Sequence, residues 1–212
     1  MTPHAHSRPA WGEPPPGPIA RLGRRLAGLL RGRPATGRPT ALPELPLVLR
    51  RSAVAAPYLD AERRRDHPAA GAAAAAASER AIAVAEWWPA DAWAHRALWH
   101  YEQAQMALEA THQARRIGDL RVAAGDPATA RRYYAEAIDE ARDIGAEREQ
   151  GLAALGLGRA QLDLGDVTVA RRLASAAITL LERSEAPAAE IDAARALLGT
   201  EVAVGEGTEE AR

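Results

Sequence analysis

Cysteine, lysine and phenylalanine are all missing from this 212-residue sequence. Without cysteine the chain cannot form a disulfide, a thiolate metal site or a cysteine nucleophile. Without lysine it lacks the phosphate-binding residue of a P-loop and the amine needed for Schiff-base chemistry. Long apolar runs free of charge are also missing, so the sequence predicts no membrane span. We therefore expect a soluble, cytoplasmic protein.

Proline is scarce outside the first third of the chain. Of 15 prolines, 12 lie in residues 1–68, and this segment carries 12 arginines against five acids, a net charge of +7, whereas the remainder carries 15 against 23, or −8. We predict a boundary near residue 69, with residues 1–68 as a largely disordered basic arm rich in proline and arginine. Within the arm, residues 18–31 place their apolar side chains on one helical face. This stretch is interpreted either as a basic helix for an anionic membrane surface or acidic partner, or as a helix that docks on the chain's own domain.

Residues 69–110 are rich in alanine and tryptophan and predict helices. Their alanine run is a strong helix former, and Pro89 is expected to end the helix that contains it. Asp91 is then well placed to cap the next helix. Residues 91–124 are predicted as one long helix or as two with a break near residue 110.

An internal repeat with a spacing of 40 residues is the most specific signal in the sequence. It is formed by Gly125-Asp126, Gly165-Asp166 and Gly205-Glu206; Gly118 and Gly158; Ala130 and Ala170; Ala137 and Ala177; and Arg131-Arg132 and Arg171-Arg172. In each unit the glycine is expected to take the left-handed conformation that ends a first helix, and the acid after it to cap a second helix. Small residues such as Ala130 and Ala174 let the two helices approach closely.

This pattern resembles the tetratricopeptide repeat. The matching residues are Ile117-Gly118, Gly125-Asp126, Ala130, Tyr134 and Ala137, and again Leu157-Gly158, Gly165-Asp166, Ala170 and Ala177. The period is longer than the roughly 34 residues usual for the family, and alanine replaces the aromatic residue expected early in the first helix. Longer units of this kind are similar to the helical arrays of large bacterial transcriptional regulators. The resemblance implies an all-α fold, a short right-handed α-solenoid of antiparallel helical hairpins.

The repeats are predicted to cover residues 111–204. Their last helix, from about Ala188 to Val204, would cover the end of the array, and residues 205–212 form a polar tail. Counting back one period from the clear units makes residues 69–110 a degenerate first unit. The array would then contain about seven helices.

Few residues are candidates for catalysis or for binding a ligand or metal. Four clustered tryptophans could line an aromatic cage, but their helical spacing favours a core packed between neighbouring helices. They are Trp87, Trp88, Trp93 and Trp99. Three histidines lack the spacing that places two metal ligands on one helix surface. They are His95, His100 and His112. Because no catalytic motif is present, we predict that the protein is not an enzyme and holds no metal or cofactor.

The resemblance also implies a partner-binding groove lined by the first helix of each unit. The residues that it places there are His112, Arg115, Arg116, Asp119, Leu155, Arg159, Leu162, Asp163, Asp192 and Arg195. Four of these are arginines, and three of the four, Arg115, Arg159 and Arg195, are spaced along the groove, where arginine can hold a carboxylate or phosphate through paired hydrogen bonds. The interspersed acids leave an ordinary solvated surface as the alternative.

These features together predict a non-catalytic protein-protein interaction scaffold that binds a peptide or helix. Two alternatives are open: a regulatory or sensor module of a bacterial transcription-regulator system, and a peripheral membrane adaptor attached through residues 18–31. No direct contact with nucleic acid is expected, because no helix-turn-helix is recognisable. The open alanine-rich face could also pair two chains into a homodimer.

Overall fold

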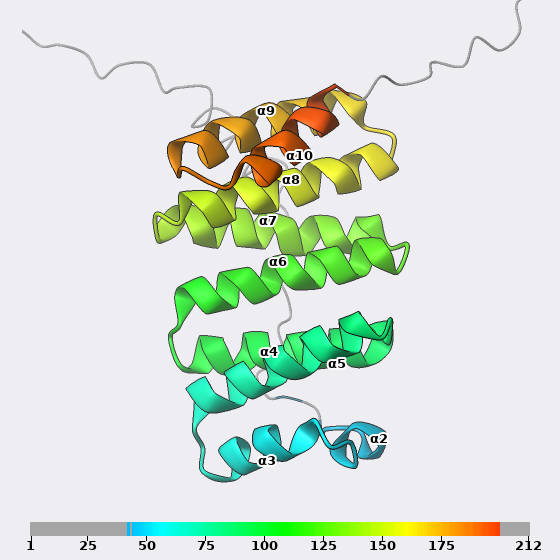
Figure 1. Cartoon of the computed structure of the whole chain (residues 1–212), viewed down its shortest axis with the longest axis vertical. Coiled ribbons are helices and arrows are strands. Elements are labelled where there is room, and N and C mark those ends of the chain that lie inside the picture. Colours follow the sequence, from blue (N-terminus) through cyan, green and yellow to red (C-terminus); the bar gives the residue numbers. More distant parts are fainter. Residues whose placement is uncertain (1–41, 43, 200–212) are drawn as a thin grey trace, which may run out of the picture. The chain divides into compact units, whose positions relative to one another are not determined.

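The computed structural model describes residue 42 and residues 44–199. In this part of the chain nine helices follow one another in a stack, and no strand occurs (Figure 1). The helices are α2 (Leu47–Arg50), α3 (Ala55–Arg63), α4 (His67–Ala83), α5 (Trp87–Gln103), α6 (Ala107–Ala123), α7 (Pro127–Asp143), α8 (Glu147–Asp163), α9 (Val167–Arg183) and α10 (Ala188–Leu198). Each helix packs on the next one along the chain. The predicted all-α solenoid of antiparallel hairpins is confirmed; the amphipathic stretch at 18–31 and Gly205 lie outside the described residues.

The helices in the middle of the stack recur at a spacing of 20 residues. Helices α4 to α9 each contain 17 residues and begin 20 residues apart. Each connection between α3 and α10 contains one residue with positive φ. These residues are Arg65, Ala85, Gln105, Gly125, Gly145, Gly165 and Glu185. The 40-residue repeat of the sequence is therefore a pair of helices of equal length.

Aspartate side chains begin three of these helices. The Oδ1 atoms of Asp66, Asp126 and Asp166 each accept a hydrogen bond of 3.0 Å from the backbone N–H three residues later, which satisfies a donor that a helix start leaves open. The predicted caps at Asp126 and Asp166 are thus confirmed. The cap predicted at Asp91 is wrong, because Asp91 lies inside α5 and Pro89 in its first turn. Proline is tolerated there since the first turn needs no N–H donor within the helix.

Residues 91–124 form parts of two helices. Helix α5 ends at Gln103 and α6 begins at Ala107, with Gln105 in the left-handed region between them (φ 57°). The break therefore lies earlier than the sequence predicted. Ala110 is buried within α6.

Small residues line the contacts between paired helices. The alanines expected there are all buried; they are Ala130, Ala137, Ala170, Ala174 and Ala177. Glycines on the first helix of a pair face large side chains of the second. A Cβ atom at Gly118 would lie 2.7 Å from the Tyr134 ring, and one at Gly71 would lie 2.8 Å from the Tyr101 ring. Because interiors are already close-packed, any side chain at these two positions would push the helices apart.

The folded region begins before the predicted boundary at residue 69. Residues 47–63, which the proline and charge pattern assigns to the disordered arm, contain α2 and α3. They begin 20 residues before α4 and occupy the place of one more 17-residue helix, interrupted at residues 51–54. Tyr58 of α3 is buried against Trp93 of α5, with ring centroids 5.2 Å apart. Proline content misplaces the boundary because Pro57 sits in the first turn of α3, where the helix accepts it.

The last described helix, α10, covers the other end of the stack. It packs on α9 and α8 and buries Ala194 and Leu197. It starts at Ala188, as predicted. The described residues end at Gly199, so the predicted end at Val204 lies outside them.

Candidate binding surface on the first helices of the pairs

Alternate helices of the stack, α4, α6, α8 and α10, are the first helices of the successive pairs. Helix α6 contacts α8, and α8 contacts α10, although one helix separates them in the sequence. Ion pairs join each neighbour to the next: Arg116 to Glu79 of α4, Arg115 to Glu149 of α8 at 3.0 Å, and Arg148 to Glu190 of α10 at 2.5 Å. We term the surface that these four helices form the A-helix surface. An ion pair thus joins each of these helices to the next, and α8 is in direct contact with both α6 and α10.

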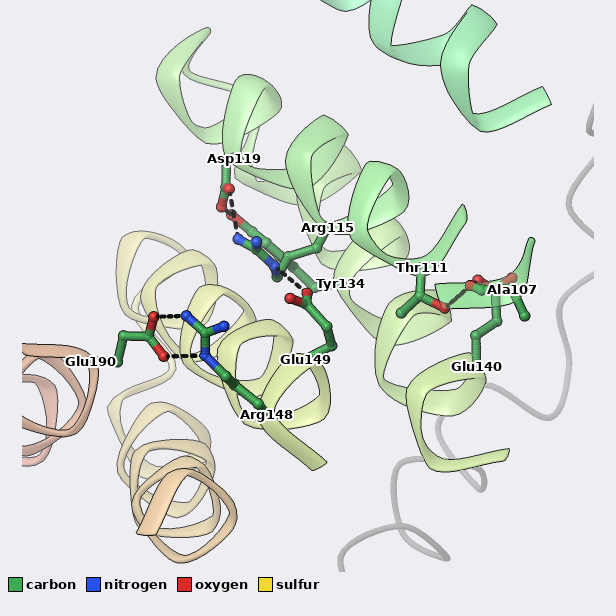
Figure 2. A network of polar contacts seen from close by, with 9 residues as sticks. All are labelled: Ala107, Thr111, Arg115, Asp119, Tyr134, Glu140, Arg148, Glu149 and Glu190. Atoms are coloured by element: carbon green, nitrogen blue, oxygen red, sulfur yellow. Dashed lines mark hydrogen bonds and ion pairs between the residues drawn. The ribbon is translucent and has the colours of Figure 1, made fainter. Parts of the chain in front are cut away.

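The centre of the A-helix surface is a hydrogen-bonded network around Arg115 (Figure 2). Its Nε donates to Glu149 Oε2 at 3.0 Å and its Nη1 donates to Asp119 Oδ2 at 3.2 Å. The other carboxylate oxygen of Asp119 accepts from the Tyr134 hydroxyl at 2.8 Å. The side chains of Arg115 and Glu149 are only 14% and 15% exposed. Burial and then the Asp119 charge raise the pKa of Tyr134, so its hydroxyl stays protonated and remains a donor.

Two glycines let Tyr134 reach this network from α7. The Tyr134 ring lies against Gly118 of α6 and Gly156 of α8, and a Cβ atom at either glycine would overlap the ring. The hydroxyl can therefore reach Asp119 of α6 from the second helix of the pair. The position of Asp119, and through it that of Arg115, depends on this packing.

Of the four predicted groove arginines, Arg116 pairs with Glu79, and the other three differ in what they can offer a partner. Arg115 is held by Glu149 and Asp119, and Arg195 donates to Glu182 at 2.8 Å and to Asp192 at 3.3 Å. Arg159 of α8 is exposed and forms no ion pair within residues 44–199. A guanidinium has five N–H donors, and donors that are bonded within the chain are not free for a partner. Arg159 is therefore the one of the three best placed to bind a carboxylate of another molecule.

The remaining predicted groove residues differ in how far they are exposed. Asp163 and Asp192 are exposed, Leu162 is half-buried and Leu155 is buried. His112 is half-buried on α6 next to Arg115. Burial, and after it the charge of Arg115, lowers the pKa of His112, while Glu149 opposes the shift. The His112 imidazole is therefore neutral near pH 7.

Sequence reasoning missed the acidic partners Glu79, Glu149 and Glu190, as well as the Tyr134 hydroxyl. A signal for the acids is present in the sequence. The three ion pairs between first helices join residues 37, 34 and 42 positions apart, which is close to the 40-residue repeat. Arginine and glutamate one repeat apart thus indicate which helices are neighbours.

A second polar cluster lies where α3, α4 and α5 meet. The Tyr58 hydroxyl donates to Glu62 Oε1 at 3.0 Å and lies 3.2 Å from His100 Nε2; His100 Nδ1 lies 3.0 Å from His67 Nδ1. Since Tyr58 gives its single proton to Glu62, His100 donates through Nε2 and accepts from His67 at Nδ1. Burial, followed by the charges of His67 and Arg96, lowers the pKa of His100 to about 4. The cluster is an internal contact that fixes α3 on the pair α4–α5.

The tryptophans divide between core and surface. Trp93 is buried, as predicted for a core residue. Trp99 is half-buried, edge-on to His100 with ring centroids 4.8 Å apart. For Trp87 and Trp88 the core prediction is wrong: both are exposed, because they occupy the first turn of α5 at the edge of the stack.

Within the described residues, no group of three or more histidine, cysteine, aspartate or glutamate side chains is arranged to hold a metal ion. No helix among these residues combines the length and the apolar character needed to cross a bilayer. The sequence matches no protein-family model, and no curated protein is significantly similar to it. The A-helix surface is therefore described from the structure of this chain and not by comparison with a relative.

Proposed function

We propose that this chain is a non-catalytic interaction scaffold, similar to a tetratricopeptide-repeat array, that binds a peptide or helix of another protein on the A-helix surface. The observation that supports this proposal most directly is the series of ion pairs joining α4, α6, α8 and α10. Helices that pack in a stack and are joined by these ion pairs form a surface that needs little further ordering when a partner arrives. Such preorganisation raises affinity because less entropy is lost on binding.

The chemistry of α8 indicates what the partner offers. Arg159 is exposed without an ion pair in the described part of the chain, Leu162 is half-buried, and Asp163 is exposed. An apolar residue flanked by charges of both signs is typical of the boundary between the core and the rim of an interface. We therefore expect a partner segment that places an apolar side chain near Leu162 and an acidic one opposite Arg159.

Site-specific photo-crosslinking tests this surface. A benzophenone amino acid replaces Arg159 in one version of the full chain and Arg172 in another. Both residues are exposed arginines, but Arg172 belongs to α9, a second helix. Illumination in cells that naturally express the chain should attach a discrete polypeptide to position 159 and not to position 172.

Once that polypeptide is identified, its affinity can be measured directly. The substitution Arg159→Glu should weaken binding about tenfold or more, because it replaces attraction by like-charge repulsion, whereas Arg172→Glu should leave binding unchanged. Equal capture at the two positions, or equal affinities of the two variants, would show that the partner does not use the A-helix surface.

A further inference from the structure

Exposed apolar side chains gather at one edge of the stack. Nine large apolar side chains in the described residues are exposed, and five of them belong to α2 or to the turn from α4 into α5. These five are Leu47 (66% exposed), Val48 (68%), Val84 (66%), Trp87 (44%) and Trp88 (57%). Figure 1 shows α2 and the connection between α4 and α5 on the same edge, at the amino-terminal end of the stack. We term these five residues the edge patch.

The two ends of the stack are covered to different extents. At the carboxyl-terminal end α10 packs on both α9 and α8. At the amino-terminal end the corresponding helix is broken, and its first part, α2, has only four residues. The last apolar surface of a helical array normally needs a cover with a polar outer face. Within the described residues the edge patch has none, and exposed tryptophans of this kind are enriched at interfaces between proteins.

Exposed charges of both signs lie beside the edge patch. At α2 the exposed charges are Arg50, Arg51 and, just before the helix, Glu44; at the α4–α5 turn they are Glu86, next to Trp87, and Arg80, one helical turn before Val84. None of the five forms an ion pair within residues 44–199. A two-fold rotation can therefore place the two arginines of α2 in one copy opposite Glu86 of the other.

This self-complementarity identifies the occupant. In a two-fold contact, α2 of one chain faces the α4–α5 turn of the other, and the same contact occurs twice. Each pair of arginines then meets a Glu86, and the apolar side chains on the two sides cover one another. We propose that the edge patch is the interface of a homodimer, in which a second copy of this chain covers the amino-terminal end of the stack.

Charge exchange between two copies provides the test. The full chain is prepared as an acidic variant, Arg50→Glu with Arg51→Glu, and as a basic variant, Glu86→Arg. Analytical ultracentrifugation should find a dimer for the unaltered chain and a dissociation constant raised about tenfold or more for each variant alone, because like charges then face each other. Mixing the two variants should restore the dimer. The acidic α2 of one chain then faces the arginine introduced at position 86 of the other, and the Glu86 that the acidic variant retains faces an unaltered α2.

A matched control and an apolar variant complete the design. Arg131→Glu with Arg132→Glu reverses an exposed arginine pair on α7 and should leave the dimer unchanged. Trp87→Ser with Trp88→Ser should abolish the dimer while circular dichroism shows that the helices persist. A chain that is monomeric at all concentrations would overturn the proposal, as would a dimer that survives the tryptophan substitutions or a mixture of charge variants that fails to associate.

Discussion

The first helical pair, α4–α5, and the two that follow, α6–α7 and α8–α9, have the same helix lengths and turn positions. They differ in the side chains that pack between their two helices. In the first pair the ring of Tyr101 packs on Gly71; in the second Tyr134 packs on Gly118; in the third Leu181 packs on Gly151. Every time the glycine lies on the first helix and the large side chain on the second. Helix length and turn position are thus constant in the array. The first and third pairs place this contact at the same positions of their helices, with a different large residue in each, whereas the second pair places it at another position along the helices.

The same pairs differ in the polar groups that they bury. The first pair holds His100 and His67 in hydrogen-bond contact beneath Tyr58. The junction of α6, α7 and α8 instead encloses Arg115 with the carboxylates of Glu149 and Asp119. The amino-terminal contact therefore depends on hydrogen bonds among imidazole and phenol groups, and the central one on an ion pair whose two side chains are largely buried.

Removal of the Tyr134 ring, which packs between α6, α7 and α8, should have the largest effect on stability. Tyr134→Ala leaves a cavity between Gly118 and Gly156 and should lower the free energy of unfolding by about 3–5 kcal/mol. Urea denaturation followed by circular dichroism measures the loss. Tyr133→Ala is the matched control, because Tyr133 is only half-buried and should cost clearly less. If the two variants were equally stable, Tyr134 would not be the residue that fills the centre of the array.

Acidification should weaken the first pair by a smaller amount. The pKa of His100 is about 4 in the folded chain, against about 6.5 in an unfolded one, so the unfolded chain binds the extra proton first. The contribution of His100 to the free energy of unfolding is therefore fully present above pH 6.5. It falls by up to about 3 kcal/mol as the pH drops to 4, and it falls no further below that pH.

The substitution His100→Gln isolates this contribution. Glutamine keeps one donor and one acceptor for Tyr58 and His67 but does not titrate. Urea denaturation of both chains between pH 7 and pH 4.5 should show a steeper loss of stability in the unaltered chain. Parallel curves would mean that groups other than His100 account for the acid sensitivity and that His100 is readily protonated in the fold.

The sequence predicts the backbone of the later pairs well, because their turn glycines and capping aspartates are visible as a repeat. Gly125, Gly165, Asp126 and Asp166 have the roles expected of them. Towards the amino terminus the repeat is hidden, since turn positions that glycine would mark are occupied by other residues such as Ala85. That is the physical reason why Pro89 is mistaken for a helix end.

The candidate surface is predicted less completely than the fold. Periodicity places Arg115 and Arg159 on the first helices, as the structure does. It does not reveal that Arg115 is already held by Glu149 and Asp119, because such a pairing depends on how two helices separated by a third approach each other. Charge pairs at one repeat spacing, such as Arg148 and Glu190, are the feature of the sequence that reports this approach.

The smallest predicted effect compares the turns of the two regions directly. Ala85, between α4 and α5, and Gly125, between α6 and α7, have φ values of 58° and 76°, and an ideal Cβ at Gly125 meets no atom within 4 Å. Gly125→Ala should therefore lower the free energy of unfolding by about 1 kcal/mol through backbone strain alone. Ala85→Gly should raise it by about 0.5 kcal/mol, because the relief of strain exceeds the added freedom of the unfolded chain. Thermal and urea denaturation of the two variants check both signs; a loss of stability in Ala85→Gly would show that the first turn is held by side-chain contacts of Ala85 and not by the backbone conformation that the two turns share.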